Sequence, residues 1–271
     1  MKTRVISGLV GAVLLIAVLV QPISLIVEIG IAALCVIAVY ELLIATKLAP
    51  SKLVCALCMA FAASVPFWRY LPQNTLWWVL YAFGALLIVA QVMRHKDQPV
   101  TATLYAAVAT VLSSLALSSI AFLRAQDHGL FLVVWMLLIP WMSDTGAYFT
   151  GVLCGKTKLC PEISPKKTVE GLIGGLFTSL IICLAAAFVY ETWISPETTV
   201  NLYIIAAVTL PGAVLSVFGD LIASLIKRQS GIKDFGNLMP GHGGVMDRFD
   251  SLLLTAPLVV LSVTQLPIFG A

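Results

Sequence analysis

Long runs of apolar residues follow one another along the whole chain, with short polar segments between them. A helix that crosses the hydrocarbon core of a bilayer needs about 20 mostly apolar residues. Runs of about this length occur nine times, at residues 4–20, 23–45, 53–69, 76–93, 102–123, 130–151, 169–190, 201–226 and 251–268. The pattern predicts an all-α polytopic integral membrane protein with about nine transmembrane helices. Only Gln21 and Pro22 separate the first two runs, so one broken helix and a total of eight is the alternative.

The basic residues lie mostly on one side of such an array of helices. Loops rich in Lys and Arg stay in the cytosol. With nine helices and a cytosolic N-terminus, 14 of the 16 Lys and Arg residues face the cytosol, and only Arg69 and Arg124 lie outside. Merging the first two runs would move Lys2 and Arg4 to the outer side. We therefore expect a cytosolic N-terminus, an outer C-terminus and a location in the inner (cytoplasmic) membrane of the cell.

The composition also favours a lipid environment. Apolar residues make up 60% of the 271 residues, charged residues make up 11%, and the mean hydropathy is +1.02. Soluble domains, by contrast, are about 45–50% apolar and about 25% charged. The net charge of +3 follows from the basic inner face, and no basic stripe interleaved with aromatic residues indicates nucleic-acid binding. The six cysteines lie in apolar runs or in a predicted cytosolic loop, and we interpret them as structural.

The polar residues divide the chain into two parts. Residues 1–128 hold about five spans with little charge inside them, and we interpret this part as a scaffold. Residues 129–271 hold about four spans, with acidic residues inside or at the cytosolic ends of apolar helices. Loops rich in Gly, Pro and Lys connect these spans in the cytosol, at residues 152–168 and 227–250. We expect the catalytic chemistry in this second part.

Asp144 lies well inside a predicted span. With a rise of about 1.5 Å per residue, it sits roughly 20 Å along a helix that begins near Leu130. An ionisable residue at such a depth is costly and indicates a function. A hydrogen bond to a neighbouring helix is the alternative interpretation.

A second basic segment follows at residues 164–167. Ser164 and Pro165 are typical of a helix start, with Ser as the N-cap and Pro in the first helical position. This pattern predicts a helix whose first turn contains Lys166 and Lys167, where the helix dipole favours anions over cations. Two lysines in that turn indicate a bound anion, and ordinary inner-face lysines are the alternative.

Carboxylates and cations come together again in the last two spans. One helical face is shared by residues spaced i, i+4, i+7 and i+8: Asp220, Ser224, Lys227 and Arg228. The start of the last helix would place three residues on one face: Asp247, Asp250 and Ser251. Carboxylates from two helices, without a His or Cys cluster, favour Mg²⁺ over zinc. The neighbouring cations indicate that phosphate is bound as well.

A glycine-rich turn, Pro240-Gly241-His242-Gly243-Gly244, lies between these carboxylates. Its backbone N–H groups can approach an anion because few Cβ atoms stand in the way. The turn therefore suits a substrate that carries a pyrophosphate. A lone His such as His242 more often orients a loop or a carboxylate than takes part in catalysis.

Three prolines fall inside the spans that carry acidic residues: Pro140, Pro211 and Pro257. Prolines within spans are tolerated where neighbours or a water-filled cavity satisfy the freed carbonyl groups. They predict a polar cavity that opens to the cytosol, and packing kinks are the alternative.

A long motif joins these features between residues 224 and 251. It reads Ser, Lys-Arg, Lys-Asp, Pro-Gly-His-Gly-Gly and Asp-Arg-x-Asp-Ser, and comprises Ser224, Lys227, Arg228, Lys233, Asp234, residues 240–244, Asp247, Arg248, Asp250 and Ser251. This motif resembles the signature of the bacterial phosphatidate cytidylyltransferases, also called CDP-diacylglycerol synthases. Residues 143–148 and 163–171 are similar to further motifs of that family. The resemblance is close over about residues 130–268, and Met239 stands where Leu is more usual.

The resemblance implies the transfer of a cytidylyl group from CTP to phosphatidate, which gives CDP-diacylglycerol and pyrophosphate and requires Mg²⁺. It implies metal-binding, catalytic carboxylates at Asp220 and Asp247, with Asp144 and Asp250 as further ligands or their supports. Lys227 and Arg228 are implied as catalytic cations that hold phosphates. Substrate-binding residues are implied at Lys166, Lys167, Ser224, Lys233, His242, Gly243, Gly244 and Arg248. Membrane lipids surround the site, and the number of metal ions, a second cation and a homodimer are left open.

An ion-coupled membrane transporter is the alternative from another functional class. Acidic residues in proline-containing helices also mark ion pathways. A transporter of this kind predicts an internal repeat, yet the charged motifs have no counterparts before residue 130. A CDP-alcohol phosphotransferase is a second enzyme alternative, but its Asp-Gly and Ala-Arg pattern does not occur here.

Overall fold

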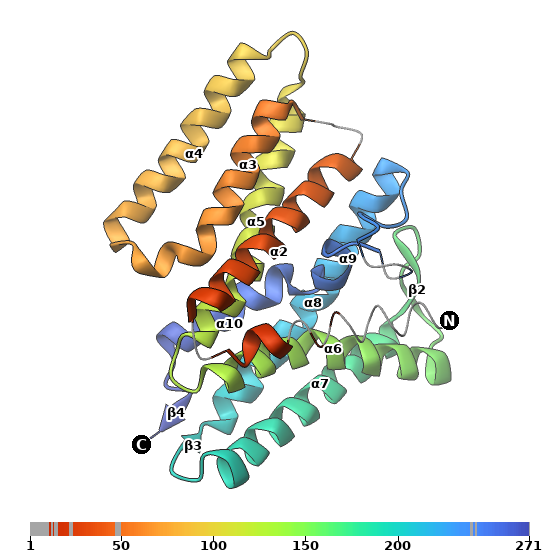
Figure 1. Ribbon diagram of the computed structural model, residues 1–271. Helices are drawn as coiled ribbons and strands as arrows, with labels where there is room; N and C mark the ends of the chain where they lie inside the picture. The colour runs from red at the N-terminus through yellow and green to blue at the C-terminus, as the bar shows by residue number, and fades with distance from the viewer. Residues whose placement is uncertain are drawn as a thin grey trace. The chain divides into compact units, whose positions relative to one another are not determined.

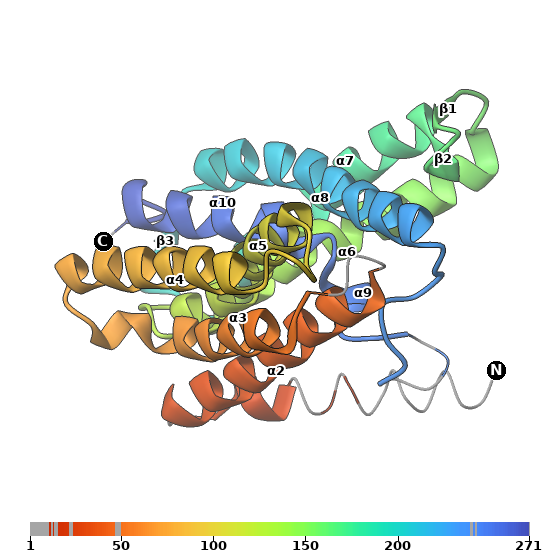
Figure 2. The same ribbon diagram turned by 90° about the horizontal axis from the view of Figure 1, so that it is seen from above.

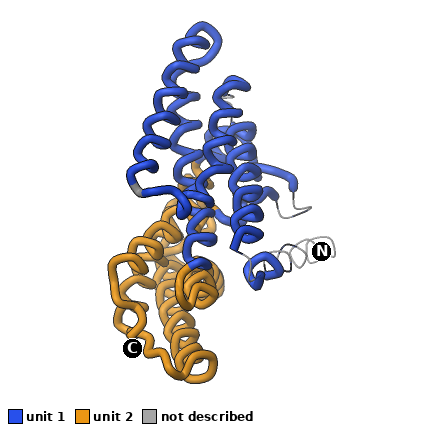
Figure 3. The backbone as a smooth tube through the Cα atoms, turned by 60° about the vertical axis from the view of Figure 1, so that its left-hand side comes forward, with its two compact units in different colours: residues 1–125, 226–249 blue, residues 126–225, 250–271 orange. Residues whose placement is uncertain are grey.

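The computed structural model describes residues 11, 13, 16–21, 24–46, 50–238, 241 and 243–270. The chain forms two compact units, which are coloured separately in Figure 3. Unit 1 comprises residues 1–125 and 226–249, and unit 2 comprises residues 126–225 and 250–271. The division of the chain into a scaffold and a catalytic part concerns function and stays a prediction.

The described part of unit 1 contains four α-helices between Ser24 and Arg124: α2 (Ser24–Ala45), α3 (Lys52–Ser64), α4 (Gln73–Met93) and α5 (Val100–Arg124). A 3₁₀ helix, η1 (Val65–Tyr70), continues α3. α3 lies between α2 and α4, and α2 also packs on α5 (Figures 1 and 2). The sulfur of Cys35 on α2 lies 3.7 Å from the Ser118 hydroxyl on α5. Small residues permit this close approach of the two helices.

Unit 2 contains the pair of helices α6 (Gly129–Cys154) and α7 (Val169–Val189), with a π-helical turn, η2 (Tyr190–Ile194), after α7. Glycines let the two backbones approach. A Cβ atom on Gly175 would lie 2.6 Å from the Ser143 carbonyl oxygen, and one on Gly171 would lie 2.8 Å from that of Ala147. Because glycine has no Cβ atom, these two positions allow α6 and α7 to lie closer together than other residues would.

Unit 2 also contains two short antiparallel sheets and two further helices. β1 (Lys158–Cys160) pairs with β2 (Ser164–Thr168), and β3 (Thr199–Val200) pairs with β4 (Phe269–Gly270). α10 (Leu252–Gln265) lies in unit 2, and the short helix α9 (Met246–Phe249) lies in unit 1. α8 (Leu202–Ser230) begins in unit 2, and its last residues belong to unit 1.

Seven of the nine predicted spans are confirmed within the described residues, as helices long and apolar enough to cross a membrane: Ser24–Ala45, Lys52–Tyr70, Asn74–Met93, Val100–Arg124, Gly129–Cys154, Val169–Ile194 and Leu202–Ser230. The predicted first span falls largely outside the described residues. The predicted last span, 251–268, is an apolar helix of only 14 residues, α10. These helices indicate an all-α, multi-pass membrane protein, while the orientation of its ends stays a prediction.

Large apolar side chains cover the outside of these helices. On α4, Trp77, Trp78 and Tyr81 are 74%, 71% and 70% exposed. A continuous apolar surface of this kind marks contact with a partner or with lipid. On a helix long enough to span a bilayer, lipid is the natural neighbour.

The predicted helix start at Ser164 is wrong. Ser164, Pro165 and the two lysines lie in strand β2, and α7 begins only at Val169. The Thr168 hydroxyl accepts a hydrogen bond from the Gly171 N–H at 3.1 Å and is the N-cap. The pairing of β2 with β1 provides hydrogen-bond partners for backbone groups that a helix would have bonded within itself. Lys166 and Lys167 therefore precede the helix and do not lie in its first turn.

The predicted single face of the last helix is also wrong. Asp247 lies in α9, whereas Asp250 and Ser251 lie in the turn that precedes α10. The break places Asp247 in unit 1 and Asp250 in unit 2. The three prolines, by contrast, lie inside α6, α8 and α10 as expected.

Candidate active site

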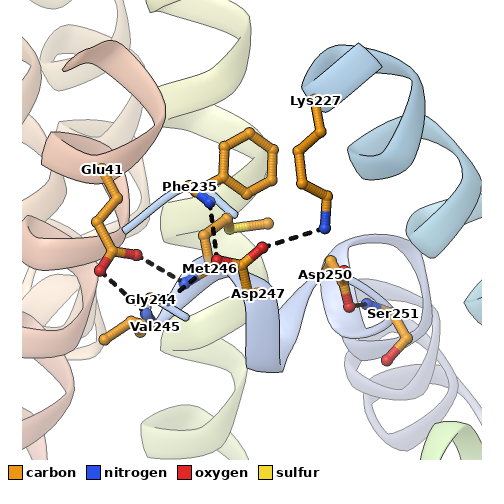
Figure 4. Close-up of polar contacts among 9 residues, drawn as sticks. All are labelled: Glu41, Lys227, Phe235, Gly244, Val245, Met246, Asp247, Asp250 and Ser251. Carbon is orange, nitrogen blue, oxygen red and sulfur yellow. Dashed lines mark hydrogen bonds and ion pairs between the residues drawn. The ribbon is translucent and has the colours of Figure 1, made fainter. Parts of the chain in front are cut away.

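Asp247 is the most firmly held carboxylate of unit 1. Its Oδ2 accepts hydrogen bonds from the backbone N–H groups of Phe235 at 2.8 Å and Gly244 at 3.0 Å. Its Oδ1 accepts one from the Lys227 ammonium at 3.1 Å (Figure 4). The side chain is only 3% exposed. Three donors therefore compensate for the loss of hydration of this charge.

Lys227 reaches Asp247 from the last turns of α8. Its ammonium group also lies 5.2 Å from the centre of the Phe235 ring. An aromatic face attracts a cation at this distance. Lys227 thus has two favourable contacts with other residues of the 224–251 motif, and its catalytic role stays a prediction.

Glu41 is a second carboxylate on this segment, and the sequence argument missed it. Its Oε1 accepts a hydrogen bond from the Val245 N–H at 3.1 Å, and its Oε2 accepts one from the Met246 N–H at 2.9 Å (Figure 4). The residue is 7% exposed and belongs to α2. Glu41 lies inside an apolar run, and the same feature indicates a function for Asp144.

The end of the glycine-rich turn and the two residues after it bind carboxylates of the protein itself. The N–H groups of Gly244, Val245 and Met246 all donate to Asp247 or Glu41. Gly243 has a φ of +85°, which favours glycine. These three N–H groups donate to carboxylates of the chain, and the binding of a substrate pyrophosphate at the turn stays a prediction.

Unit 2 contains the second group of charged residues. The Lys167 ammonium lies 2.6 Å from Asp220 Oδ2, with side chains that are 23% and 27% exposed. Asp144 interacts electrostatically with both. The three predicted residues, which come from α6, β2 and α8, therefore lie close together.

A cavity of about 260 Å³ adjoins this group inside unit 2. Its polar lining comes from Asp144, Tyr148, Ser164, Lys166, Lys167 and Thr168. Val217 and Leu172 add apolar surface. A cavity with two lysines on one wall can take an anionic group and an adjoining apolar chain.

The β1–β2 hairpin positions the two lysines. Glu170, in the first turn of α7, accepts hydrogen bonds from the N–H groups of Lys156 and Thr157, each at 3.1 Å. Thr168 caps the same helix. The hairpin is therefore tied to α7 at its start and at its end, and Lys166 and Lys167 lie between these ties.

The chain matches one protein family over almost its whole length. The model of the Cytidylyltransferase family aligns with residues 2–266. The chain belongs to the cytidylyltransferase family. It is 43% identical to a phosphatidate cytidylyltransferase of Staphylococcus aureus (strain COL) over 144 residues, which are 53% of each chain. It is 37% identical to one of Haemophilus influenzae over 205 residues, 74% of this chain and 61% of that protein. The match thus spans about half the length of the staphylococcal relative.

In this cytidylyltransferase family member, Asp250 is fixed locally. Its Oδ1 accepts the Ser251 N–H at 2.9 Å (Figure 4). A Cβ atom on Gly219 of α8 would lie 2.6 Å from the Asp250 carbonyl oxygen, so glycine permits this contact. Asp250 and α8 are therefore closely packed within unit 2.

The other predicted residues of this family member are distributed more widely. Arg228, Lys233 and Arg248 are exposed, and Ser224 is half-buried on α8. His242 lies outside the described residues. In the part of the chain that the structure describes, no three His, Cys, Asp or Glu side chains gather closely enough to hold a metal ion. The roles of these residues stay predictions.

Proposed function

We propose that this membrane protein transfers a cytidylyl group from CTP to phosphatidate, with CDP-diacylglycerol and pyrophosphate as products. The family match over residues 2–266 carries this proposal. The names of the bacterial relatives support the choice of phosphatidate as the acceptor. The same match weighs against the transporter alternative.

The reaction is a phosphoryl-type transfer. A phosphate oxygen of phosphatidate attacks the α-phosphorus of CTP, and a new P–O bond forms. The bond from the α-phosphorus to the bridging oxygen breaks, and pyrophosphate leaves with the electron pair. Such transfers depend mainly on positioning and on charge neutralisation. Phosphatidate supplies an ionised oxygen, so no strong general base is required.

Each unit contains an ion pair of a lysine and an aspartate. In the free protein, Lys227 neutralises Asp247 and Lys167 neutralises Asp220. We expect both lysines to turn toward substrate phosphates when CTP and phosphatidate bind. Lys166, on the wall of the cavity beside Lys167, would hold the phosphate of the lipid.

The residues present fit Mg²⁺. Their donor atoms are carboxylate oxygens, which this ion prefers. Asp247 Oδ2 accepts two backbone N–H groups and Oδ1 accepts the Lys227 ammonium, so a metal could bind Oδ1 only after Lys227 turns away. The sequence motif leads us to propose Asp220 and Asp247 as metal ligands, with Asp144 and Asp250 as further ligands or supports. Bound there, Mg²⁺ would offset the phosphate charge and orient the reacting groups.

The proposed site faces the cytosol, where CTP is found, at the level of the lipid headgroups. The test is pyrophosphate release by the purified protein in detergent with CTP and Mg²⁺, with and without phosphatidate. We expect release only when phosphatidate is present, together with a CDP-lipid product. Phosphatidate-independent release, or none at all from folded protein, would contradict the proposal.

A further inference from the structure

The signature segment, residues 224–251, binds a carboxylate from a distant part of the chain. Glu41 lies on α2, about 200 residues before the turn, yet its two oxygens accept the N–H groups of Val245 and Met246. Both distances, 3.1 and 2.9 Å, are those of good hydrogen bonds. One carboxylate thus fixes two successive peptide groups immediately before Asp247.

Two glycines make room for this carboxylate. A Cβ atom on Gly236 or on Gly244 would collide with the oxygens of Glu41. Neither glycine has the positive φ that would require glycine for backbone reasons. Glycine at both positions therefore leaves room for the Glu41 side chain, which lies against both residues of the signature segment.

Asp247 joins two distant points of the same segment, and Glu41 holds the residues next to one of them. Asp247 accepts the N–H groups of Phe235 and Gly244, and Glu41 accepts the next two N–H groups along the chain. The backbone N–H groups next to Asp247 thus donate to two carboxylates, and both carboxylates are buried. A buried N–H group without an acceptor destabilises the fold, so loss of Glu41 would release this backbone.

We propose that Glu41 is a positioning residue for cytidylyl transfer: it fixes the Val245 and Met246 peptide groups and thereby orients the Asp247 carboxylate. This inference rests on the proposed function and extends it to the N-terminal helices. Glu41 does not touch substrate in this account. It acts through the backbone of the signature segment.

The test compares Glu41→Gln with Glu28→Gln in the full-length protein. Glu28 is a matched control because it is also buried on α2, but its partner is Arg69 at 2.7 Å. The glutamine at position 41 keeps the size of the side chain and loses one of two acceptor oxygens. We expect Glu41→Gln to lower kcat at least about tenfold per folded protein, with KM for CTP and phosphatidate changed less than about threefold. Glu28→Gln should lower the thermal midpoint and leave kcat within about twofold.

Hydrogen exchange supplies a readout that does not depend on activity. In Glu41→Gln, exchange of the amides in residues 243–249 should accelerate, and in Glu28→Gln it should match the wild type. An unchanged kcat in Glu41→Gln, or a lost kcat with unchanged exchange, would overturn the positioning role. If Glu41→Gln does not fold, Gly236→Ala serves instead, because its methyl group displaces the carboxylate without removing it. A wild-type protein without cytidylyl transfer would contradict the proposed function. The exchange comparison would still show whether Glu41 holds the backbone of residues 243–249.

Discussion

The Asp247 region of unit 1 and the Asp220 region of unit 2 hold their carboxylates in different ways. Asp247 has three donors and is almost fully buried, whereas Asp220 pairs with one lysine and its side chain is 27% exposed. The first carboxylate is part of the local fold, and the second adjoins an open group of charges beside a cavity. The difference predicts that the two aspartates contribute unequally to stability, although both are proposed to bind the metal.

The largest expected effect follows from neutralising either aspartate. Asp247→Asn and Asp220→Asn should each lower kcat by several orders of magnitude, because each is proposed to bind the metal. The assay is CDP-lipid formation by purified, monodisperse protein. Near-normal turnover in both variants would end the assignment of these two residues.

The same variants separate the two regions by their stability. Asp247→Asn places an amide NH₂ against either Lys227 or the Phe235 and Gly244 N–H groups, and a mismatched buried donor costs about 1–3 kcal/mol. Asp220→Asn loses a partly exposed ion pair, worth about 0–1 kcal/mol. The thermal midpoint should therefore fall clearly only in Asp247→Asn. Equal shifts in both variants would remove the distinction between the regions.

Lysine removal should have a smaller effect than aspartate removal. Lys227→Ala and Lys167→Ala should each lower kcat/KM about 10- to 100-fold, since a charge-assisted contact to phosphate is worth about 1.5–3 kcal/mol. Steady-state kinetics with CTP and phosphatidate varied separately show which substrate each lysine holds. An unchanged kcat/KM for both substrates would count against that lysine.

Helix packing in unit 2 offers a still smaller perturbation. Gly175→Ala brings a methyl group against the Ser143 carbonyl, and overpacking of this kind costs about 1–3 kcal/mol. Gly84→Ala on α4 is the matched control, because nothing lies within 4 Å of its added Cβ atom. The control should keep or slightly raise the thermal midpoint, as alanine favours a helix. A loss of stability of the same size in both variants would contradict the close packing of α6 and α7.

The smallest expected effect concerns the N-cap of α7. Thr168→Ala removes the acceptor of the Gly171 N–H and should cost about 1 kcal/mol. Because Thr168 adjoins Lys167, we expect a few-fold rise in KM as well. Thr168→Ser keeps the hydroxyl group and should retain wild-type behaviour. A Thr168→Ser variant as impaired as Thr168→Ala would show that the cap is not the cause.

The sequence predicts local features better than contacts between distant segments. Span lengths and positions depend on runs of apolar residues, so seven helices lie where they were expected. Asp144 and Asp220 stand out because each charge lies in an apolar helix, whereas Lys167 was singled out on a helix start that the structure does not have. The β1–β2 hairpin was missed because Ser164-Pro165 also fits a strand, and only the pairing with β1 decides between the two structures.

The role of Glu41 was not readable from local sequence. Its partners are backbone N–H groups 204 and 205 positions away, and backbone groups carry no identity in the sequence. Gly244 belongs to the predicted turn and Gly236 does not, and neither residue indicates in the sequence that a side chain from α2 fills the space beside it. Contacts of this kind emerge only from the folded chain.

Labelled CTP shows directly whether the protein transfers a cytidylyl group to phosphatidate. Purified protein is supplied with phosphatidate, Mg²⁺ and CTP labelled in either the α- or the γ-phosphate, and lipid and aqueous fractions are separated. The account predicts that the α-label moves into the lipid fraction and the γ-label appears in pyrophosphate, in equal amounts and only with phosphatidate. A γ-label in the lipid fraction, or no transfer by folded protein, would contradict it.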